Sequence, residues 1–370
     1  MTGNEAVVEG AILAGCRFYA GYPITPASEV LELMASRLPG VGGVFVQCED
    51  EISSVCMVIG ASWAGFKAMT ATSGPGFSLM QEAIGLATIT ETPIVITNIM
   101  RAGPSTGVPT KPFQGDVMQA RWGSHGHYEI IVLAPSYVQE MYDLTIKAFN
   151  LSEKFRVPVI ILSDALLSHL RENIWVRDRS EVEIHNRKTP SCSPSEFKPY
   201  RPGPDLVPEM AVFGSGYRVH VESLAHNEEG FFEENAYQQL VKRLSDKILN
   251  ARGEIVETET IIPDGCEKLL VSYGSIARIV KSFVKSRIRA GDCKIGFLRP
   301  KVLWPVDEEA IADASRNVDE ILVVEMNYGQ YFREVARIAG VKKTRLLPWL
   351  KLEPPSVKDL SRVISHALGG

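Results

Sequence analysis

The chain has 370 residues, of which 45% are hydrophobic and 22% are charged, and its formal net charge is -5. This length predicts two or three domains, and the net charge argues against nucleic-acid binding. The apolar stretch Pro93–Met100 is far shorter than the ~18 residues of a membrane span, and residues 1–5 lack the pattern of a secretion signal. We therefore expect no membrane partner and a cytoplasmic location.

Short β-rich runs alternate with helical periodicity over residues 1–168. The predicted strands are Arg17–Ala20, Gly43–Cys48, Lys67–Thr72, Ile94–Ile99, Glu129–Leu133 and Val157–Leu162. The predicted helices are Ala27–Leu38, Ile52–Gly65, Ser78–Thr90 and Tyr137–Lys154. Such alternation is typical of an α/β domain in which helices cover both faces of a mostly parallel, doubly wound sheet.

Residues 169–264 have a different pattern. Two stretches, 189–195 and 199–204, are rich in Pro, Ser and Gly, which are loop signals, and a polar helix is predicted over about residues 233–252. We interpret this segment as a connecting arm and helix, of the kind that packs on partner subunits.

The α/β alternation resumes over residues 265–370. The predicted strands are Lys268–Tyr273, Lys294–Leu298 and Glu320–Met326, and the predicted helices are Ala277–Ala290, Glu308–Ser315 and Tyr331–Ala339. This pattern predicts a second α/β domain of about a hundred residues.

Two segments near the start of the chain point to one crevice. Residues 21–26 read Gly-Tyr-Pro-Ile-Thr-Pro and follow a predicted strand, with Thr25 where an N-cap belongs and Pro26 at the first helical position. Glu49, Asp50 and Glu51 open the helix after the next strand. Carboxyl ends of strands and helix N-termini are where open α/β sheets bind small anionic ligands. The acidic cluster could instead merely complement the helix dipole.

Two further strand ends carry residues suited to ligand binding. Ser73, Gly74, Pro75 and Gly76 form a turn before a helix, and their small size allows close backbone approach to a bound ring, although a tight turn alone would also explain them. The turn lacks the dinucleotide fingerprint G-x-G-x-x-G. Arg101 follows the strand Ile94–Ile99 and is placed to bind a carboxylate, unless it is simply solvated.

In combination these motifs resemble the pyrimidine-binding domain of thiamine-diphosphate enzymes, specifically the α subunit of 2-oxoacid:ferredoxin oxidoreductases. Residues 265–370 resemble the C-terminal domain of transketolase-type enzymes. The resemblance implies that Glu51, with Glu49 as the alternative, activates the cofactor by a hydrogen bond to its pyrimidine. It implies cofactor contacts from Tyr22, Pro23, Ile24 and residues 73–76. It also implies that Thr25 and Arg101 hold the carboxylate of the 2-oxoacid.

The segments around Gly74 and Arg101 look most like the 2-oxoglutarate branch of this family, which implies formation of succinyl-CoA from 2-oxoglutarate and CoA with reduction of ferredoxin. A second substrate carboxylate needs further donors, for which Lys111 and His125 are candidates, although either could be a solvated loop residue. Branched-chain 2-oxoacids or pyruvate are the alternative substrates. A non-oxidative thiamine enzyme and a non-catalytic Rossmann-like protein also remain open.

Two absences in the sequence predict partner chains. No Gly-Asp-Gly occurs, so the resemblance implies that a β subunit holds the diphosphate and Mg²⁺. The six cysteines are far apart and no C-x-x-C occurs, so we expect no metal site here and [4Fe-4S] clusters on partner chains alone. Subunits of γ and δ type are expected in addition.

Overall fold

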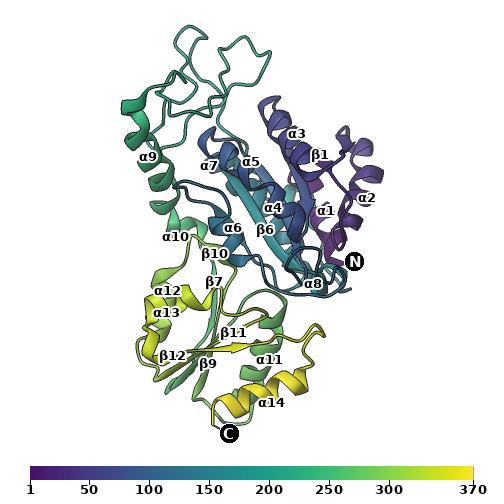
Figure 1. Ribbon diagram of the computed structural model, residues 1–370, viewed down its shortest axis with the longest axis vertical. Coiled ribbons are helices and arrows are strands. Elements are labelled where there is room, and N and C mark those ends of the chain that lie inside the picture. The colour runs from purple at the N-terminus through teal and green to yellow at the C-terminus, as the bar shows by residue number, and fades with distance from the viewer. Residues whose placement is uncertain (370) are drawn as a thin grey trace.

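The computed structural model describes residues 1–369 and contains two β-sheets with helices packed on both faces of the first (Figure 1). The seven-stranded sheet has the spatial order β10-β5-β6-β4-β3-β1-β2. Its strands are β1 (Cys16–Gly21), β2 (Val44–Gln47), β3 (Lys67–Thr72), β4 (Ile94–Met100), β5 (Ile131–Leu133), β6 (Pro158–Asp164) and β10 (Val302–Trp304). Strands β1 to β6 are parallel and β10 is antiparallel to β5, which confirms the doubly wound α/β class.

The helices of this half divide between the two faces of the sheet. They are α1 (Gly3–Leu13), α2 (Ser28–Arg37), α3 (Glu51–Trp63), α4 (Gly74–Leu79), α5 (Gln81–Ile89), α6 (Val117–Trp122), α7 (Val138–Phe155) and α8 (Ala165–His169). Alternate residues of each strand point to opposite faces. On β4, Val95 packs in the core formed with α1, α2 and α7, whereas Ile94 and Ile96 pack in the core formed with α3 and α5.

Several local features differ from the sequence predictions. Helix α1, capped by Thr2 and Glu5, is absent from the predicted elements, as are α6 and α8. The predicted helix 78–90 is two helices, α4 and α5, with their boundary at Met80. Thr25 is not an N-cap, because residues 24–27 form a turn closed by a 2.8 Å hydrogen bond from the Ala27 N–H to the Ile24 carbonyl, and α2 begins only at Ser28.

The arm forms loops beyond one end of the first sheet and returns through α9 (Tyr237–Leu249), which is shorter than the predicted helix (Figure 1). A buried cluster of charged side chains attaches α9 to the first domain. The fully buried Glu91 lies 2.6 Å from Arg243 Nη2 and 2.8 Å from Lys247 Nζ, both on α9. The arm is therefore attached to the first domain by paired charges as well as by apolar contacts.

The second sheet has the order β12-β11-β8-β9-β7. Its strands are β7 (Thr258–Ile261), β8 (Lys268–Val271), β9 (Ile295–Pro300), β11 (Glu320–Glu325) and β12 (Thr344–Pro348). The helices around it are α10 (Arg252–Ile255), α11 (Gly274–Arg289), α12 (Glu308–Ser315), α13 (Phe332–Ala339) and α14 (Val357–Ala367). Only β7 is antiparallel to its neighbour.

The two sheets are joined by one strand, β10, which follows the second-sheet strand β9 in the chain but pairs with the first sheet; the sequence pattern does not predict this. Directly after β9, the chain leaves the second sheet and β10 pairs with β5 at the edge of the first. Hydrogen bonds from Ala134 N to Lys301 O and from Lys301 N to Glu257 O continue this connection. In the part of the chain that the structure describes, no helix is long and apolar enough to cross a membrane.

Candidate active site

The candidate site lies at the carboxyl edge of β1, β3 and β4. These three strands are parallel neighbours, so the segments that leave them meet at one edge of the sheet. Residues 22–27 leave β1, the first turn of α4 leaves β3 at Ser73, and Arg101 directly follows β4. The sequence prediction that these motifs share one crevice agrees with this arrangement.

Glu51 is the first residue of α3, and the Asp50 side chain caps that helix by accepting a 2.7 Å hydrogen bond from the Ser53 N–H. The Glu51 residue is 5% exposed, and its carboxylate accepts a hydrogen bond from its own backbone N–H. Burial, with the nearby Asp50 charge, raises the pKa of Glu51 against the lowering effect of its own amide and of Arg101. In contrast, Glu49 is exposed.

Gly76 on α4 sets how close the helix comes to this carboxylate. A Cβ at Gly76 would overlap both Glu51 Oε1 and Thr72 Oγ1, so a residue with a side chain cannot take this place without a shift of the site. The same geometry places the Thr72 hydroxyl beside the Glu51 carboxylate. The glycine that the sequence singled out is therefore needed for close approach, and the structure puts it directly over Glu51.

Arg101 is 6% exposed and is oriented by the loop that follows β1. Its Nη1 donates a 2.7 Å hydrogen bond to the Thr25 carbonyl, whereas its Nε is buried without a partner. Burial lowers the pKa of Arg101, and the charges of Asp116 and Glu51 raise it. The guanidinium is thus held in place at one nitrogen and keeps other donors free for an anion.

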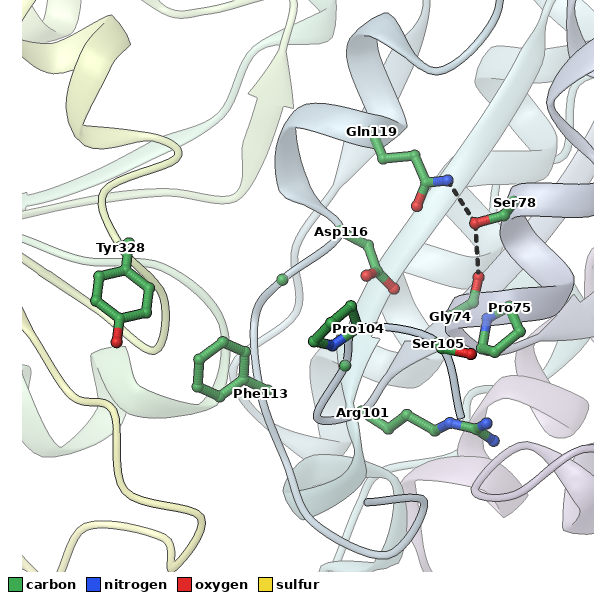
Figure 2. A pocket seen from close by; sticks show the side chains of 12 residues that line it. Gly74, Pro75, Ser78, Arg101, Pro104, Ser105, Phe113, Asp116, Gln119 and Tyr328 are labelled. Atoms are coloured by element: carbon green, nitrogen blue, oxygen red, sulfur yellow. Dashed lines mark hydrogen bonds between the residues drawn. The ribbon is translucent and has the colours of Figure 1, made fainter. Parts of the chain in front are cut away.

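A cavity of about 460 Å³ opens beside Arg101 (Figure 2). Its wall includes Gly74 and Pro75 of α4, Ser105 of the loop after β4, and Asp116 at the start of α6. Tyr328 of the second domain borders the cavity from the other side and is 77% exposed. A 2.8 Å hydrogen bond from Gln119 Nε2 to Ser78 Oγ closes one end of the wall.

Several buried polar atoms near this cavity have no hydrogen-bond partner. They are Thr72 Oγ1, Ser73 Oγ, Asn98 Oδ1 and Arg101 Nε. Buried polar groups in proteins are normally paired, and unpaired ones mark positions where a ligand or other group completes the bonding. These residues therefore fit a ligand with polar groups placed near Arg101 and the first turn of α4.

The other predicted site residues divide into two groups. Tyr22, Pro23 and Thr25 are exposed on the loop after β1, with Ile24 half-buried beside them. Lys111 instead pairs with Glu353 at 2.6 Å, and His125 is exposed in the loop after α6; neither lines the cavity. The structure brings Thr25, Glu51, Arg101 and residues 73–76 together, whereas the side chains of Lys111 and His125 lie outside the cavity.

Asp116 is a cavity residue that the sequence reasoning missed as a functional group. In the sequence it stands in Gly115-Asp116-Val117, which lacks the third residue of a Gly-Asp-Gly motif. The sequence feature that could have identified it is a polar turn before a short helix, and this feature is too common to be specific.

Over residues 1–369, no group of three or more His, Cys, Asp or Glu side chains could hold a metal ion.

Two family models match the chain. Residues 9–246 match the model described as pyruvate flavodoxin/ferredoxin oxidoreductase, thiamine diphosphate-binding, and residues 266–348 match pyruvate:ferredoxin oxidoreductase core domain II. The chain is 52% identical over 350 residues to 2-oxoglutarate synthase subunit KorA of Methanothermobacter marburgensis, covering 94% of this chain and 92% of that protein. It is 37% identical over 368 residues to ketoisovalerate oxidoreductase subunit VorB of the same organism, covering 99% and 97%.

A solved structure extends this similarity. The 2-oxoglutarate:ferredoxin oxidoreductase from Magnetococcus marinus, with 2-oxoglutarate, coenzyme A and succinyl-CoA bound, superposes with a TM-score of 0.92 at 33% identity. The match covers 99% of this chain, which spans 64% of the length of that solved chain. The predicted family and fold class are confirmed. The chain belongs to the pyruvate flavodoxin/ferredoxin oxidoreductase family of enzymes, as a subunit with a thiamine-diphosphate-binding domain.

Proposed function

We propose that this chain is the α subunit of a 2-oxoglutarate:ferredoxin oxidoreductase. With its partner chains it converts 2-oxoglutarate and CoA into succinyl-CoA and CO₂ and reduces ferredoxin. The observation that carries the proposal is the placement of the buried Glu51 carboxylate and the Arg101 guanidinium at one edge of the sheet, with Gly76 packed over Glu51. The 52% identity to a 2-oxoglutarate synthase subunit supports this substrate.

In this proposal Glu51 binds the pyrimidine ring of thiamine diphosphate. When bound, the cofactor would supply the carbanion chemistry of the reaction. A carboxyl whose pKa is raised by burial is suited to share a proton with a ring nitrogen, and Gly76 leaves room for that contact. Tyr22, Pro23 and Ile24 on one side and residues 73–76 on the other complete the pyrimidine pocket.

Arg101 holds the carboxylate next to the oxo group of the substrate. Its position is set by the hydrogen bond to the Thr25 carbonyl, and the Thr25 side chain binds the same carboxylate. Charge-assisted hydrogen bonds from a guanidinium to a carboxylate are among the stronger polar contacts in proteins. Lys111 and His125 stay predictions for the second carboxylate; both would have to move into the cavity or act from a closed complex.

The remaining parts of the reaction are assigned to partner chains. A β subunit provides the diphosphate and Mg²⁺ site, and β, γ or δ subunits provide the [4Fe-4S] clusters that pass electrons to ferredoxin. The sequence without Gly-Asp-Gly and the scattered cysteines support this division. The complex operates in the cytoplasm.

A substrate comparison on the assembled complex tests the proposal. The complex is supplied with CoA, thiamine diphosphate and ferredoxin, and ferredoxin reduction is measured with 2-oxoglutarate, 3-methyl-2-oxobutanoate and pyruvate. We expect the highest kcat/KM with 2-oxoglutarate. A preference for 3-methyl-2-oxobutanoate would favour the second candidate, ketoisovalerate oxidation, to which the 37% identity with VorB points. Decarboxylation without any ferredoxin reduction would instead indicate a non-oxidative thiamine enzyme.

A further inference from the structure

The cavity contains a carboxylate that the proposed function does not use. Asp116 precedes α6 and reaches into the space between Gln119 and Pro104, on the same wall as Arg101 (Figure 2). The Asp116 side chain does not cap α6, so helix capping does not account for an acid at this position.

The second domain fixes the backbone on both sides of Asp116. Gln330 donates a 2.6 Å hydrogen bond from Nε2 to the Gly115 carbonyl and accepts a 2.9 Å hydrogen bond at Oε1 from the Met118 N–H. Gln114 is bound in turn to the backbone of Met326 through both its N–H and its Oε1. Contacts of this kind hold functional groups in one orientation.

The side chain of Asp116 is held at one oxygen. Asn98 Nδ2, which is fully buried on β4, donates a 3.0 Å hydrogen bond to Asp116 Oδ2. Burial raises the pKa of Asp116, and the Asn98 hydrogen bond and the Arg101 charge lower it. The ionisable side chains near it are Arg101, on the same cavity wall, Glu51, which faces Arg101 from α3, and Tyr328, across the cavity.

Acyl transfer to a thiol requires a base. A free thiol has a pKa near ~8.5, and only the thiolate is an effective nucleophile. Glu51 is committed to the cofactor in the proposed function. Among the described residues that line the cavity, only Asp116 carries a carboxylate. Tyr328, which lines the cavity, is exposed at the protein surface, and we infer that the thiol enters on this side.

We propose that Asp116 is a catalytic residue that accepts the proton of the CoA thiol when the acyl group is transferred, an inference that rests on the proposed function. The S–H bond breaks, the proton moves to the Asp116 carboxylate, and the sulfur keeps the electron pair. That pair forms the new C–S bond at the acyl carbon, and the cofactor carbon that carried the acyl unit would leave with the electrons of the C–C bond that breaks. Asp116 then returns the proton to solvent through the open side of the cavity.

The test separates the reaction into a step without thiol and a step with thiol. The variant is Asp116→Asn, which preserves the shape and the oxygen that accepts from Asn98, and the control is Asp264→Asn at an exposed turn of the second domain. Each is assembled with its partner chains. Stopped-flow absorbance follows reduction of the iron–sulfur clusters by 2-oxoglutarate without CoA, and quenched flow follows succinyl-CoA formation after CoA is added.

We expect Asp116→Asn to leave cluster reduction without CoA within about twofold of the wild type. Formation of succinyl-CoA should fall by ~10²-fold, the usual effect of losing a positioned base. In the wild type this rate should rise with pH through the pKa of Asp116. In the variant it should follow the thiol, rising toward pH ~8.5. A thiol acceptor of lower pKa should restore part of the lost rate in the variant.

Infrared difference spectra provide a readout that does not depend on turnover. A protonated-carboxyl band that titrates in the full chain should disappear in Asp116→Asn and remain in Asp264→Asn. Equal losses in both kinetic steps, or a normal thiol step, would overturn the inference while leaving the proposed function intact. A wild-type complex whose clusters 2-oxoglutarate does not reduce would overturn the proposed function, and the inference with it.

Discussion

Two buried glutamates in the first domain lie in opposite electrostatic environments. Burial tends to raise the pKa of Glu91, but Lys247 and Arg243 more than offset this, and the pKa falls to about 2. At Glu51 burial dominates, and the pKa is raised. Glu91 has two cations within hydrogen-bond distance, whereas Glu51 accepts a hydrogen bond from its own amide. The ion pairs of Glu91 attach the arm to the first domain, whereas the Glu51 carboxylate, which has no ion-pair partner among the described residues, lies in the candidate active site.

The junction of the arm with the first domain and the carboxyl edge of the sheet therefore have different roles. At the junction, the buried Glu91 carboxylate is structural, because its removal would leave the charges of Arg243 and Lys247 without a counter-charge. At the strand edge, Glu51, Arg101 and the unpartnered hydroxyls of Thr72 and Ser73 leave bonding capacity unused within this chain. Five predictions test that contrast.

The largest expected effect is on assembly. The isolated chain should bind thiamine diphosphate very weakly and be inactive, because it contributes the pyrimidine contacts and the partner contributes the diphosphate site. Adding the β-type partner should restore cofactor binding and activity together, as measured by isothermal calorimetry and ferredoxin reduction. Tight Mg²⁺-dependent binding by the chain alone would contradict the division of the site.

Glu91→Gln should destabilise the protein by about 3–5 kcal/mol, because it leaves Lys247 and Arg243 buried without a counter-charge. Urea unfolding of the full chain measures this change. The matched control is Lys242→Gln, which breaks the exposed pair with Asp246 on the same helix and should cost less than about 1 kcal/mol. Equal effects of the two substitutions would remove the distinction between the junction and an ordinary surface pair.

The same cluster predicts a pH dependence with a defined sign. Because the folded-state pKa of Glu91 lies below its unfolded value, its ion pairs stabilise the protein fully above pH ~5 and less as the pH falls toward ~2. The free energy of unfolding should therefore decrease over this range in the wild type, and less steeply in Glu91→Gln. Parallel profiles for the two proteins would indicate that Glu91 is not the group responsible.

Glu51→Gln should lower turnover of the assembled complex by ~10²-fold or more, because the amide cannot share a proton with the pyrimidine. Its unfolding free energy should be unchanged or slightly increased, since the substitution removes a buried charge without a cationic partner. Steady-state kinetics and urea unfolding provide the two measurements. The exposed Glu49→Gln variant is the comparison, and loss of activity there instead would transfer the role to Glu49.

The smallest of the expected effects concerns Arg101. Arg101→Ala removes a charge-assisted contact worth roughly 1.5–3 kcal/mol, so kcat/KM for the 2-oxoacid should fall by ~10- to 150-fold. Affinity for thiamine diphosphate in the assembled complex should change little. If cofactor affinity alone responds, Arg101 belongs to the cofactor site and not to the substrate site.

Local sequence was sufficient for most elements of the fold. Hydrophobic periodicity located β3 and α12 correctly at both ends and most other elements within a few residues. It also placed Glu51 at the start of a helix, because strand alternation and helix caps depend on neighbouring residues. The turn predicted over residues 73–76 is instead the first turn of α4, which begins at Gly74. The division of the chain into a first domain (1–168), an arm (169–264) and a second domain (265–370) stays a prediction.

Long-range contacts decided the rest. The pairing of β10 with β5, the Arg101 contact with the Thr25 carbonyl, and the two glutamines that hold Asp116 each join residues distant in sequence. No local propensity encodes such contacts, since they exist only once the sheet and the second domain have packed. Local sequence places particular residue types at the edge of the sheet, whereas tertiary packing selects which of them are paired and which keep free hydrogen-bonding groups.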